Sequence, residues 1–105
     1  MPASKETKKS IAENGGDARW YVYLALCADG SEYCGICTDP DVRMKKHNGE
    51  LPGGAKYTRT RRPVTLEHAV GMPSKSAALK AERTVKCLPK AQKLAFLKTL
   101  GTTET

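Results

Sequence analysis

Two short tyrosine-containing strings, followed by one arginine, are the part of this sequence best suited to phosphate chemistry. Tyr21-Val22-Tyr23 and Tyr33-Cys34-Gly35 place two tyrosines ten residues apart, and Arg43 follows after ten more. A tyrosine hydroxyl can bind phosphate, or accept a proton from water where nearby cations lower its pKa. A guanidinium matches phosphate oxygens and can offset charge that develops in a transition state. Tyrosine is also common on half-exposed strands, so the strings are not decisive alone.

Two further residues, His47 and Glu82, could take part in the same chemistry. His47 follows Arg43 by four residues, on one side of a predicted helix, where it could relay a proton or simply complement the helix dipole. Glu82 falls within the apolar stripe of another predicted helix, where a carboxylate is costly unless paired. Two interpretations of Glu82 stay open: a ligand for Mg²⁺, or an internal ion pair with Arg43 or Lys86.

A run of cations follows in a predicted loop and is a candidate nucleic-acid interface. The chain has a formal net charge of +7, from 18 Lys and Arg against 11 Asp and Glu, which attracts polyanions. Cations in this run would contact phosphates and its tyrosine would stack on bases, although a solvated loop is the alternative. The candidate binding residues are Lys56, Tyr57, Arg59, Arg61 and Arg62.

Cys34 and Cys37 form a C-x-x-C string, which raises the alternative of a zinc or thiol-redox protein. Both cysteines fall in a predicted strand, where alternation points them to opposite faces and disfavours joint chelation. We therefore expect ordinary reduced thiols in a cytoplasmic protein.

The elements that must position these residues begin with a β-hairpin. Trp20–Cys27 and Glu32–Cys37 have the composition of strands, and Asp29-Gly30 between them is a hairpin-turn signal. Period-two alternation puts Tyr23 and Tyr33 together on the face opposite the main core.

The remaining elements are mainly helical and complete an α+β fold. Thr38 or Asp39 is expected to cap a helix with Pro40 at its first position. The predicted order is β-β-α-β-α-α, a small three-stranded, mostly antiparallel sheet flanked by helices. After the hairpin we expect a helix to about Asn48, a loop over 49–62, a strand over Val64–Val70, and helices over about Ser74–Cys87 and Pro89–Leu100.

The length of 105 residues predicts one domain, with its folded body over residues 19–100. Residues 1–18 are expected to be a disordered N-terminal tail and residues 101–105 a flexible C-terminal tail, because few of their side chains are large and apolar. There is no apolar stretch typical of a signal peptide or a membrane span, so we expect a cytoplasmic protein.

These strings, in this order and spacing, resemble the GIY-YIG nuclease family. Tyr21-Val22-Tyr23 is similar to the GIY string in its last residue, and Tyr33-Cys34-Gly35 is similar to YIG with Cys for the central Ile. Arg43, His47 and Glu82 fall where the family has its arginine, a histidine or tyrosine, and its metal-binding glutamate. The segment Gly53–Pro63 is similar to that of small stand-alone bacterial members (YhbQ-like), and the resemblance covers about Arg19 to Lys98.

The resemblance implies a metal-dependent endonuclease that hydrolyses phosphodiester bonds of branched or single-stranded DNA, in repair or recombination. Tyr23 would then act as general base, Tyr33 would position water or phosphate, and His47 would assist the proton transfer. Arg43 would stabilise the transition state, and Glu82 would hold one Mg²⁺ or Mn²⁺ ion. The alternative function is a non-catalytic nucleic-acid-binding module with the same fold.

Overall fold

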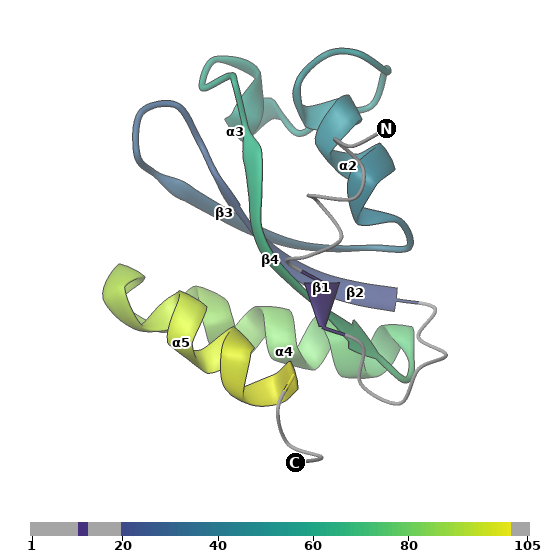
Figure 1. Ribbon diagram of the computed structural model, residues 1–105, viewed down its shortest axis with the longest axis vertical. Coiled ribbons are helices and arrows are strands. Elements are labelled where there is room, and N and C mark those ends of the chain that lie inside the picture. The colour runs from purple at the N-terminus through teal and green to yellow at the C-terminus, as the bar shows by residue number, and fades with distance from the viewer. Residues whose placement is uncertain (1–10, 13–19, 102–105) are drawn as a thin grey trace.

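A twisted sheet with helices on both faces is the framework of this protein, as the computed structural model shows (Figure 1). The structure describes residues 11–12 and 20–101. The sheet has the strand order β1-β4-β2-β3, which makes β3 an edge strand. Its strands are β1 (Ile11–Ala12), β2 (Trp20–Leu26), β3 (Glu32–Cys37) and β4 (Thr65–Met72).

The predicted hairpin of β2 and β3 is confirmed. The two strands are antiparallel, with Tyr23 opposite Gly35. At the turn, the Asp29 carboxylate accepts hydrogen bonds from the backbone N–H and the hydroxyl of Ser31, at 3.0 and 2.6 Å. Gly30 has a φ of +87°, a left-handed conformation that glycine adopts without steric cost. Local turn chemistry therefore sets the register that pairs the two tyrosine strings.

The third predicted strand, β4, pairs antiparallel with β2 and completes the three-stranded sheet. A bulge between Leu24 and Ala25 leaves Glu67 of β4 without an opposite residue. The bulge reverses the alternation within β4, so that Val70 and Leu66, which are both at even positions, pack in different cores.

A fourth strand, β1, lies at the other edge of the sheet. Ile11 and Ala12 pair in parallel with Ala69 and Val70 of β4. These two residues fall within the segment 1–18 that we expected to be disordered, and they form a short strand. The remaining residues of that segment, and residues 102–105 of the expected C-terminal tail, lie outside the described residues.

Side-chain caps mark the starts of two helices. In α2 (Pro40–His47), the Asp39 carboxylate accepts hydrogen bonds from the N–H groups of the first turn, and in α4 (Lys75–Cys87) the Ser74 hydroxyl does the same. The predicted loop over 49–62 contains a short helix, α3 (Lys56–Arg59), and the chain closes with α5 (Lys90–Gly101). In the described part of the chain, no helix has the length and apolarity needed to cross a bilayer.

Two hydrophobic cores lie on the two faces of the sheet. The face toward α4 and α5 buries the main core, which includes Val22, Leu24, Cys34, Val70, Val85 and Leu97. The opposite face buries Tyr23, Ala25, Cys37, Met44, Val64 and Ala69 beneath α2 and the segment before β4. Cys34 and Cys37 thus point to opposite faces, as predicted. Leu26 is 37% exposed at the end of β2.

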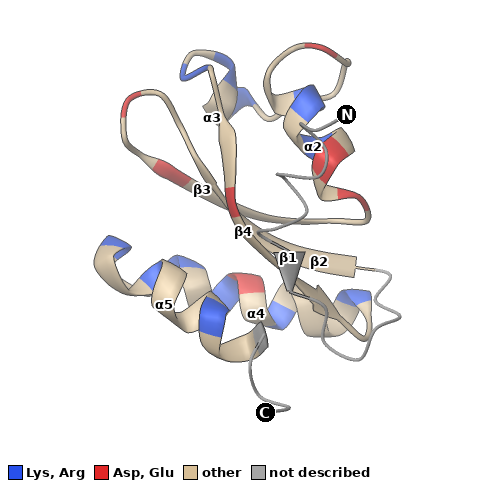
Figure 2. Cartoon of the chain, viewed as in Figure 1, with Lys and Arg blue, Asp and Glu red and all other residues tan. Residues whose placement is uncertain are grey.

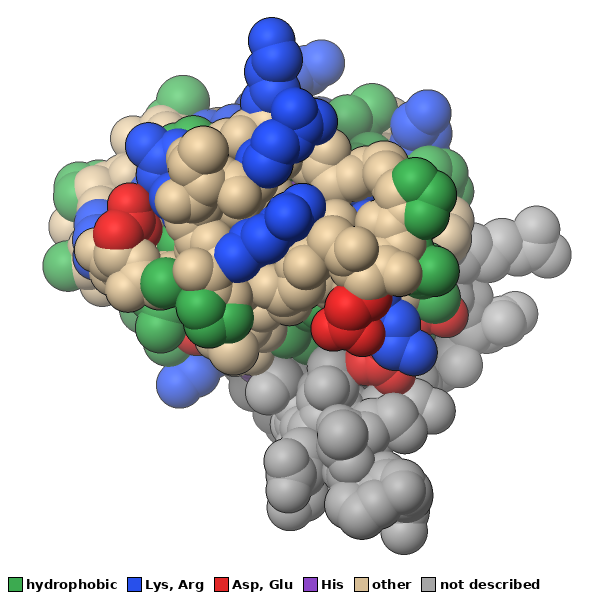
Figure 3. Space-filling model, turned by 90° about the horizontal axis from the view of Figure 1, so that it is seen from above, with side chains coloured by type: hydrophobic (Ala, Val, Ile, Leu, Met, Phe, Trp, Pro, Cys, Tyr) green, Lys and Arg blue, Asp and Glu red, His purple; other side chains and the backbone are tan. Residues whose placement is uncertain are grey.

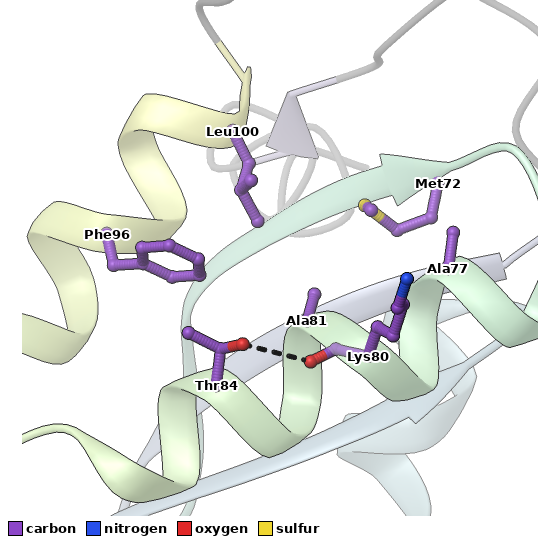
Figure 4. Close-up of a pocket in the computed structure, with 7 residues that line it drawn as sticks. All are labelled: Met72, Ala77, Lys80, Ala81, Thr84, Phe96 and Leu100. Carbon is purple, nitrogen blue, oxygen red and sulfur yellow. Dashed lines mark hydrogen bonds between the residues drawn. The ribbon is translucent and has the colours of Figure 1, made fainter.

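An apolar pocket of about 370 Å³ lies in the helical layer formed by α4 and α5 (Figure 4). It is lined by Met72, Ala77, Lys80, Ala81, Thr84, Phe96 and Leu100. These side chains come from the layer opposite α2, so the pocket is separate from the tyrosine, arginine and histidine side chains described next.

Candidate active site

Four of the predicted site residues meet on the sheet face covered by α2. Tyr23 comes from β2, Tyr33 from the edge strand β3, and Arg43 and His47 from α2. The His47 ring centroid is 5.9 Å from that of Tyr23 and 5.2 Å from that of Tyr33, and the two tyrosine centroids are 6.4 Å apart. The sequence prediction that strand alternation and helical spacing bring these residues together is therefore confirmed for these four.

The Tyr23 hydroxyl lies at the centre of this cluster. It is 2.7 Å from Nε2 of His47 and accepts a hydrogen bond from Nε of Arg43 at 3.3 Å. Both Tyr23 and His47 are fully buried, although Tyr23 lies on the face opposite the main core. The cause is the second core, which α2 and the segment after it build over the sheet.

Gly35 makes room for this hydroxyl. A Cβ atom at position 35 would lie 2.7 Å from the Tyr23 hydroxyl oxygen and 2.9 Å from Cζ of the same ring. Both distances are shorter than side-chain atoms tolerate. The glycine of the Tyr33-Cys34-Gly35 string is therefore required by the close passage of the Tyr23 side chain over the neighbouring strand.

Thr58 fixes the protonation pattern of His47. Its hydroxyl donates to the carbonyl of Ala55 at 2.9 Å, and its Oγ1 lies 3.0 Å from Nδ1 of His47. Because the hydroxyl proton is used on Ala55, Nδ1 must be the donor to Oγ1. Nε2 is then an acceptor, and the Tyr23 hydroxyl donates to it. Sequence reasoning missed Thr58, because a buried threonine in a charged segment has no pattern that distinguishes it.

Burial keeps both residues of this pair neutral, and the neighbouring arginines add to its effect on His47. Burial raises the pKa of Tyr23 well above its usual value, and Arg43 opposes only part of that rise. Burial also lowers the pKa of His47 to about 4, helped by the positive charges of Arg43 and Arg62. At neutral pH a protonated phenol therefore faces an unprotonated imidazole nitrogen. The arrangement can pass a proton from Tyr23 to His47.

Arg43 connects the Tyr23 hydroxyl to the loop after α2. Its Nη1 donates to the carbonyl of Gly53 at 3.0 Å, in addition to the bond from Nε to Tyr23. Burial acts to lower the pKa of Arg43, but the hydrogen bond and charge of Tyr23 outweigh it and raise the pKa. The half-buried guanidinium thus stays charged, and a phosphate could replace Gly53 as its second partner.

Glu82 belongs to α4, on the face of the sheet opposite this cluster. Its carboxylate pairs with Lys86, one turn along α4, at 3.1 Å. Of the two ion-pair partners we considered, Lys86 is therefore the one found. The contacts that gather Tyr23, Tyr33, Arg43 and His47 do not include Glu82 in the described part of the chain.

Electrostatic contacts nevertheless connect Glu82 to the edge strand that carries Tyr33. Burial raises the pKa of the Cys34 thiol to about 12, and the next largest cause is the Glu82 charge. Lys86, whose pKa is raised first by its bond to Glu82, also interacts with Tyr33. Tyr33 and Cys34 are adjacent on β3, so Glu82 lies beneath the same stretch of strand that Tyr33 presents to α2.

The donor set around Glu82 limits the kind of metal site it can form. No group of three or more His, Cys, Asp or Glu side chains gathers into a metal site within residues 11–12 and 20–101. Mg²⁺ commonly uses one or two carboxylates and completes its shell with waters and phosphate oxygens. As a single carboxylate, Glu82 could therefore hold a Mg²⁺ ion whose other ligands are waters and oxygens of a substrate phosphate. Lys86, whose side chain is 55% exposed, would have to release the carboxylate.

The predicted nucleic-acid-binding segment divides into anchoring and exposed side chains. Arg61 pairs with Asp29 at 3.2 Å and lies 3.9 Å from the centre of the Tyr57 ring. Tyr57 in turn stacks on Tyr33, with ring centres 5.7 Å apart. A base that stacked on Tyr57 would therefore compete with contacts within the chain.

Arg62 also has a structural partner, because its Nε donates to the His47 carbonyl at 2.7 Å. Lys56 and Arg59 of α3 are exposed. Lys and Arg side chains cross the surface at this end of the molecule (Figure 3). Phosphate contacts by Lys56 and Arg59 fit this arrangement best, while Arg61 and Arg62 hold the segment against the hairpin turn and α2.

Comparison with known proteins finds relatives over almost the whole folded body. The family described as the GIY-YIG catalytic domain matches residues 19–95. A UPF0213 protein of Cupriavidus pinatubonensis is 46% identical over 89 residues, which cover 85% of this chain and 97% of that protein. A UPF0213 protein of Streptococcus sanguinis is 47% identical over 78 residues, covering 74% and 87%. The solution NMR structure of protein EF2693 from E. faecalis has a TM-score of 0.53 and 41% identity, covering 84% of this chain and 88% of that one.

Proposed function

This chain belongs to the GIY-YIG family, and on that premise we propose that it is an endonuclease that hydrolyses DNA phosphodiester bonds with one divalent cation. The observation that carries the proposal is the Tyr23 hydroxyl held between the Arg43 guanidinium and the unprotonated Nε2 of His47. The phenol thus contacts both a positive charge, which can stabilise the transition state at phosphate, and a base, which can accept a proton.

Substrate binding uses the half-buried groups at the edge of this cluster. Arg43 exchanges the Gly53 carbonyl for an oxygen of the scissile phosphate and keeps its bond to Tyr23. Tyr33, on the edge strand, contacts the same phosphate or the attacking water. Tyr23 is fully buried, so the loop that holds Gly53 must move for water to reach it. Displacement of Gly53 by the phosphate provides that movement.

Proton transfer then passes through Tyr23 to His47. As the attacking water gives a proton to the Tyr23 oxygen, Tyr23 gives its own proton to Nε2 of His47. No free phenolate forms, which matters because burial holds the pKa of Tyr23 high. The incoming phosphate offsets the charges of Arg43 and Arg62 that disfavour protonated His47. General base assistance of this kind contributes about 10² to 10⁴ in rate.

Glu82 is the residue that would hold Mg²⁺ or Mn²⁺. Such an ion, when bound, supplies charge stabilisation at the phosphate and its leaving oxygen. When the ion is bound, the ion pair between Glu82 and Lys86 is broken, and Lys86 can contact a phosphate. Because one carboxylate gives little affinity alone, metal and DNA should bind together.

The second candidate function is a nucleic-acid-binding module without catalysis. The Glu82–Lys86 ion pair and the full burial of Tyr23 favour it, since both must change before hydrolysis. Such a module would bind DNA with a strong salt dependence and leave it intact in the presence of Mg²⁺ or Mn²⁺.

We further propose that the enzyme acts in the cytoplasm, on branched or single-stranded DNA in repair or recombination. Cys27, Cys34 and Cys37 are buried free thiols, which suits a reducing compartment. The exposed cations of α3 suit a nucleic-acid backbone.

A nicking assay tests the proposed function. Supercoiled plasmid is incubated with the protein and Mg²⁺, Mn²⁺ or EDTA, and Glu82→Gln is purified and assayed in parallel. We expect nicking that requires the metal and is lost in Glu82→Gln. Binding to DNA without nicking under all these conditions would favour the non-catalytic module instead.

A further inference from the structure

The positive charge of this protein is concentrated in α4 and α5. Residues 75–101 include seven Lys and Arg and a single acidic residue, Glu82, whereas the rest of the chain has eleven Lys and Arg against ten Asp and Glu. Figure 2 shows the cationic positions along both helices and the one acidic position in α4. The excess positive charge therefore lies on the layer opposite α2 and α3.

Three of these lysines lie beside the edge strand β3. Lys86 pairs with Glu82 and interacts with Tyr33. Lys90 donates from Nζ to the carbonyl of Gly30, in the turn between β2 and β3. Lys93 donates to the carbonyl of Val85 at 2.8 Å.

The charges of two of these lysines also act on Cys34 of β3. Lys86 and Lys93 oppose part of the rise in its pKa that burial and Glu82 cause. We call Lys86, Lys90 and Lys93 the edge lysine cluster.

Nearby acids offset only part of the positive charge of the edge lysine cluster. Glu82 is neutralised by Lys86. Glu32 and Glu67 interact with each other, and burial followed by the neighbouring Glu32 raises the pKa of Glu67 to about 7. At neutral pH Glu67 is therefore partly protonated and carries less than one negative charge. Lys90 and Lys98 also act on Glu67.

We propose that the edge lysine cluster is a second phosphate-binding site, which contacts the DNA backbone beside the scissile phosphate. This inference rests on the proposed function. Tyr33 points from β3 toward α3, where it stacks on Tyr57, and Cys34 points toward α4. A backbone that crosses the edge of β3 thus meets Arg43, Lys56 and Arg59 on one side and the edge lysine cluster on the other.

The lysine contacts within the chain favour this role. Each ammonium group has three donors, and one bond to a carbonyl leaves the others for phosphate. Lys90 and Lys93 are held in place by those carbonyl bonds, so less side-chain entropy is lost when a ligand binds. The enzyme would then hold phosphates on both sides of the cleaved bond.

Salt-dependent DNA binding tests this site without relying on cleavage. A short fluorescein-labelled DNA duplex is titrated with the protein in EDTA at several salt concentrations, and anisotropy gives the affinity. The test variant is K90Q/K93Q. The control K75Q/K80Q removes the same charge from the N-terminal half of α4, where Lys75 lies over the Trp20 ring at 5.2 Å. K90R/K93R keeps the charge, and thermal melting confirms that each variant folds.

We expect K90Q/K93Q to weaken binding and to reduce the slope of log affinity against log salt by about 1.8, which is about 0.9 for each lost phosphate contact. K75Q/K80Q and K90R/K93R should keep the wild-type slope. Equal slopes for K90Q/K93Q and K75Q/K80Q would overturn the second site, and persistent metal-dependent nicking would then leave the proposed function intact. Failure of the wild-type protein to bind the duplex at any salt concentration would also overturn the second site, whereas the metal-dependent nicking assay decides the proposed function.

Discussion

The Tyr23 hydroxyl and Nε2 of His47 lie 2.7 Å apart, with both residues fully excluded from solvent. They come from a strand and a helix, 24 residues apart in the sequence. Arg43 and Thr58 occupy the other hydrogen-bonding positions of this pair, so each polar atom in it has a defined partner. The direction of the proton between Tyr23 and His47 follows from those partners.

Tyr23→Phe should abolish proton transfer while keeping the ring in the second core. We expect the single-turnover rate of DNA cleavage to fall by about 10² to 10⁴. The loss of the hydroxyl leaves Nε2 of His47 unpaired in a buried place, so the free energy of unfolding should also fall by about 1 to 3 kcal/mol. Urea denaturation measures that cost separately. A variant that cleaves at the wild-type rate would show that Tyr23 handles no proton.

Thr58→Val should disturb the tautomer of His47 without changing the shape of the site. Valine keeps the volume but provides no acceptor for the Nδ1 proton. The tautomer with the proton on Nδ1 is then no longer favoured over the one with the proton on Nε2. We expect the ¹⁵N chemical shifts of the His47 ring to show a mixture of tautomers, and the cleavage rate to fall by roughly tenfold or more. Thr58→Ser, which restores the hydroxyl, should recover both. Unchanged ring shifts in Thr58→Val would contradict this assignment.

Gly35→Ala should displace the Tyr23 ring. The new methyl group would lie 2.7 Å from the Tyr23 hydroxyl, so we expect overpacking to cost about 1 to 3 kcal/mol of stability, together with a large loss of cleavage. Gly30→Ala is the control, because its methyl group meets nothing within 4 Å and only the positive φ is strained. It should lower stability and leave cleavage by the folded protein unchanged. Adding Tyr23→Phe to Gly35→Ala should recover part of the lost stability, which a double-mutant cycle measures.

His47 should make the protein less stable in acid. Its folded pKa is about 4, against an ordinary value of 6.5. Between these values the unfolded chain binds a proton that the folded chain does not. The free energy of unfolding should therefore fall as the pH drops from 6.5 to 4, by about 3 kcal/mol in total.

Glu67 has the opposite effect in part of the same pH range, because its folded pKa is raised from 4.5 to about 7. The His47 contribution is therefore measured as the difference in pH dependence between the wild type and His47→Gln, in which the Glu67 contribution cancels. Since the pKa of His68 is also lowered, His68→Gln is the histidine control and should keep the His47 contribution. Parallel stability curves for the wild type and His47→Gln over this range would contradict a neutral buried His47.

Local patterns in the sequence predicted which residues share a face, but not which residues are buried. Alternation fixed Tyr23 and Tyr33 on one side of the hairpin, and caps fixed the start of α2 and hence Arg43 and His47. The same alternation cannot show that α2 and the segment after it cover Tyr23 completely, because that depends on the path of the chain between residues 49 and 62. The short helix α3 and the contact from Thr58 to His47 both lie in that stretch.

Glu82 shows a second limit of prediction from the sequence, which concerns the choice of an ion-pair partner. Helical periodicity identified it as a carboxylate on an apolar face, and two ion-pair partners were considered. The structure selects Lys86, which is four residues away, over Arg43 on the other side of the sheet. Sequence spacing could not make this choice, because it does not show which helices share a layer.

The most direct test of the whole account is the single-turnover cleavage rate of Tyr23→Phe, Glu82→Gln and the double variant, each measured with Mn²⁺ on one DNA substrate. If the phenol and the carboxylate act on the same phosphate from the two faces of the sheet, each single variant should lose at least about a hundredfold in rate. The double variant should then be little slower than the slower single variant, because groups that act as a unit are not additive. Wild-type rates in both single variants, or rate losses that multiply in the double variant, would contradict a shared site.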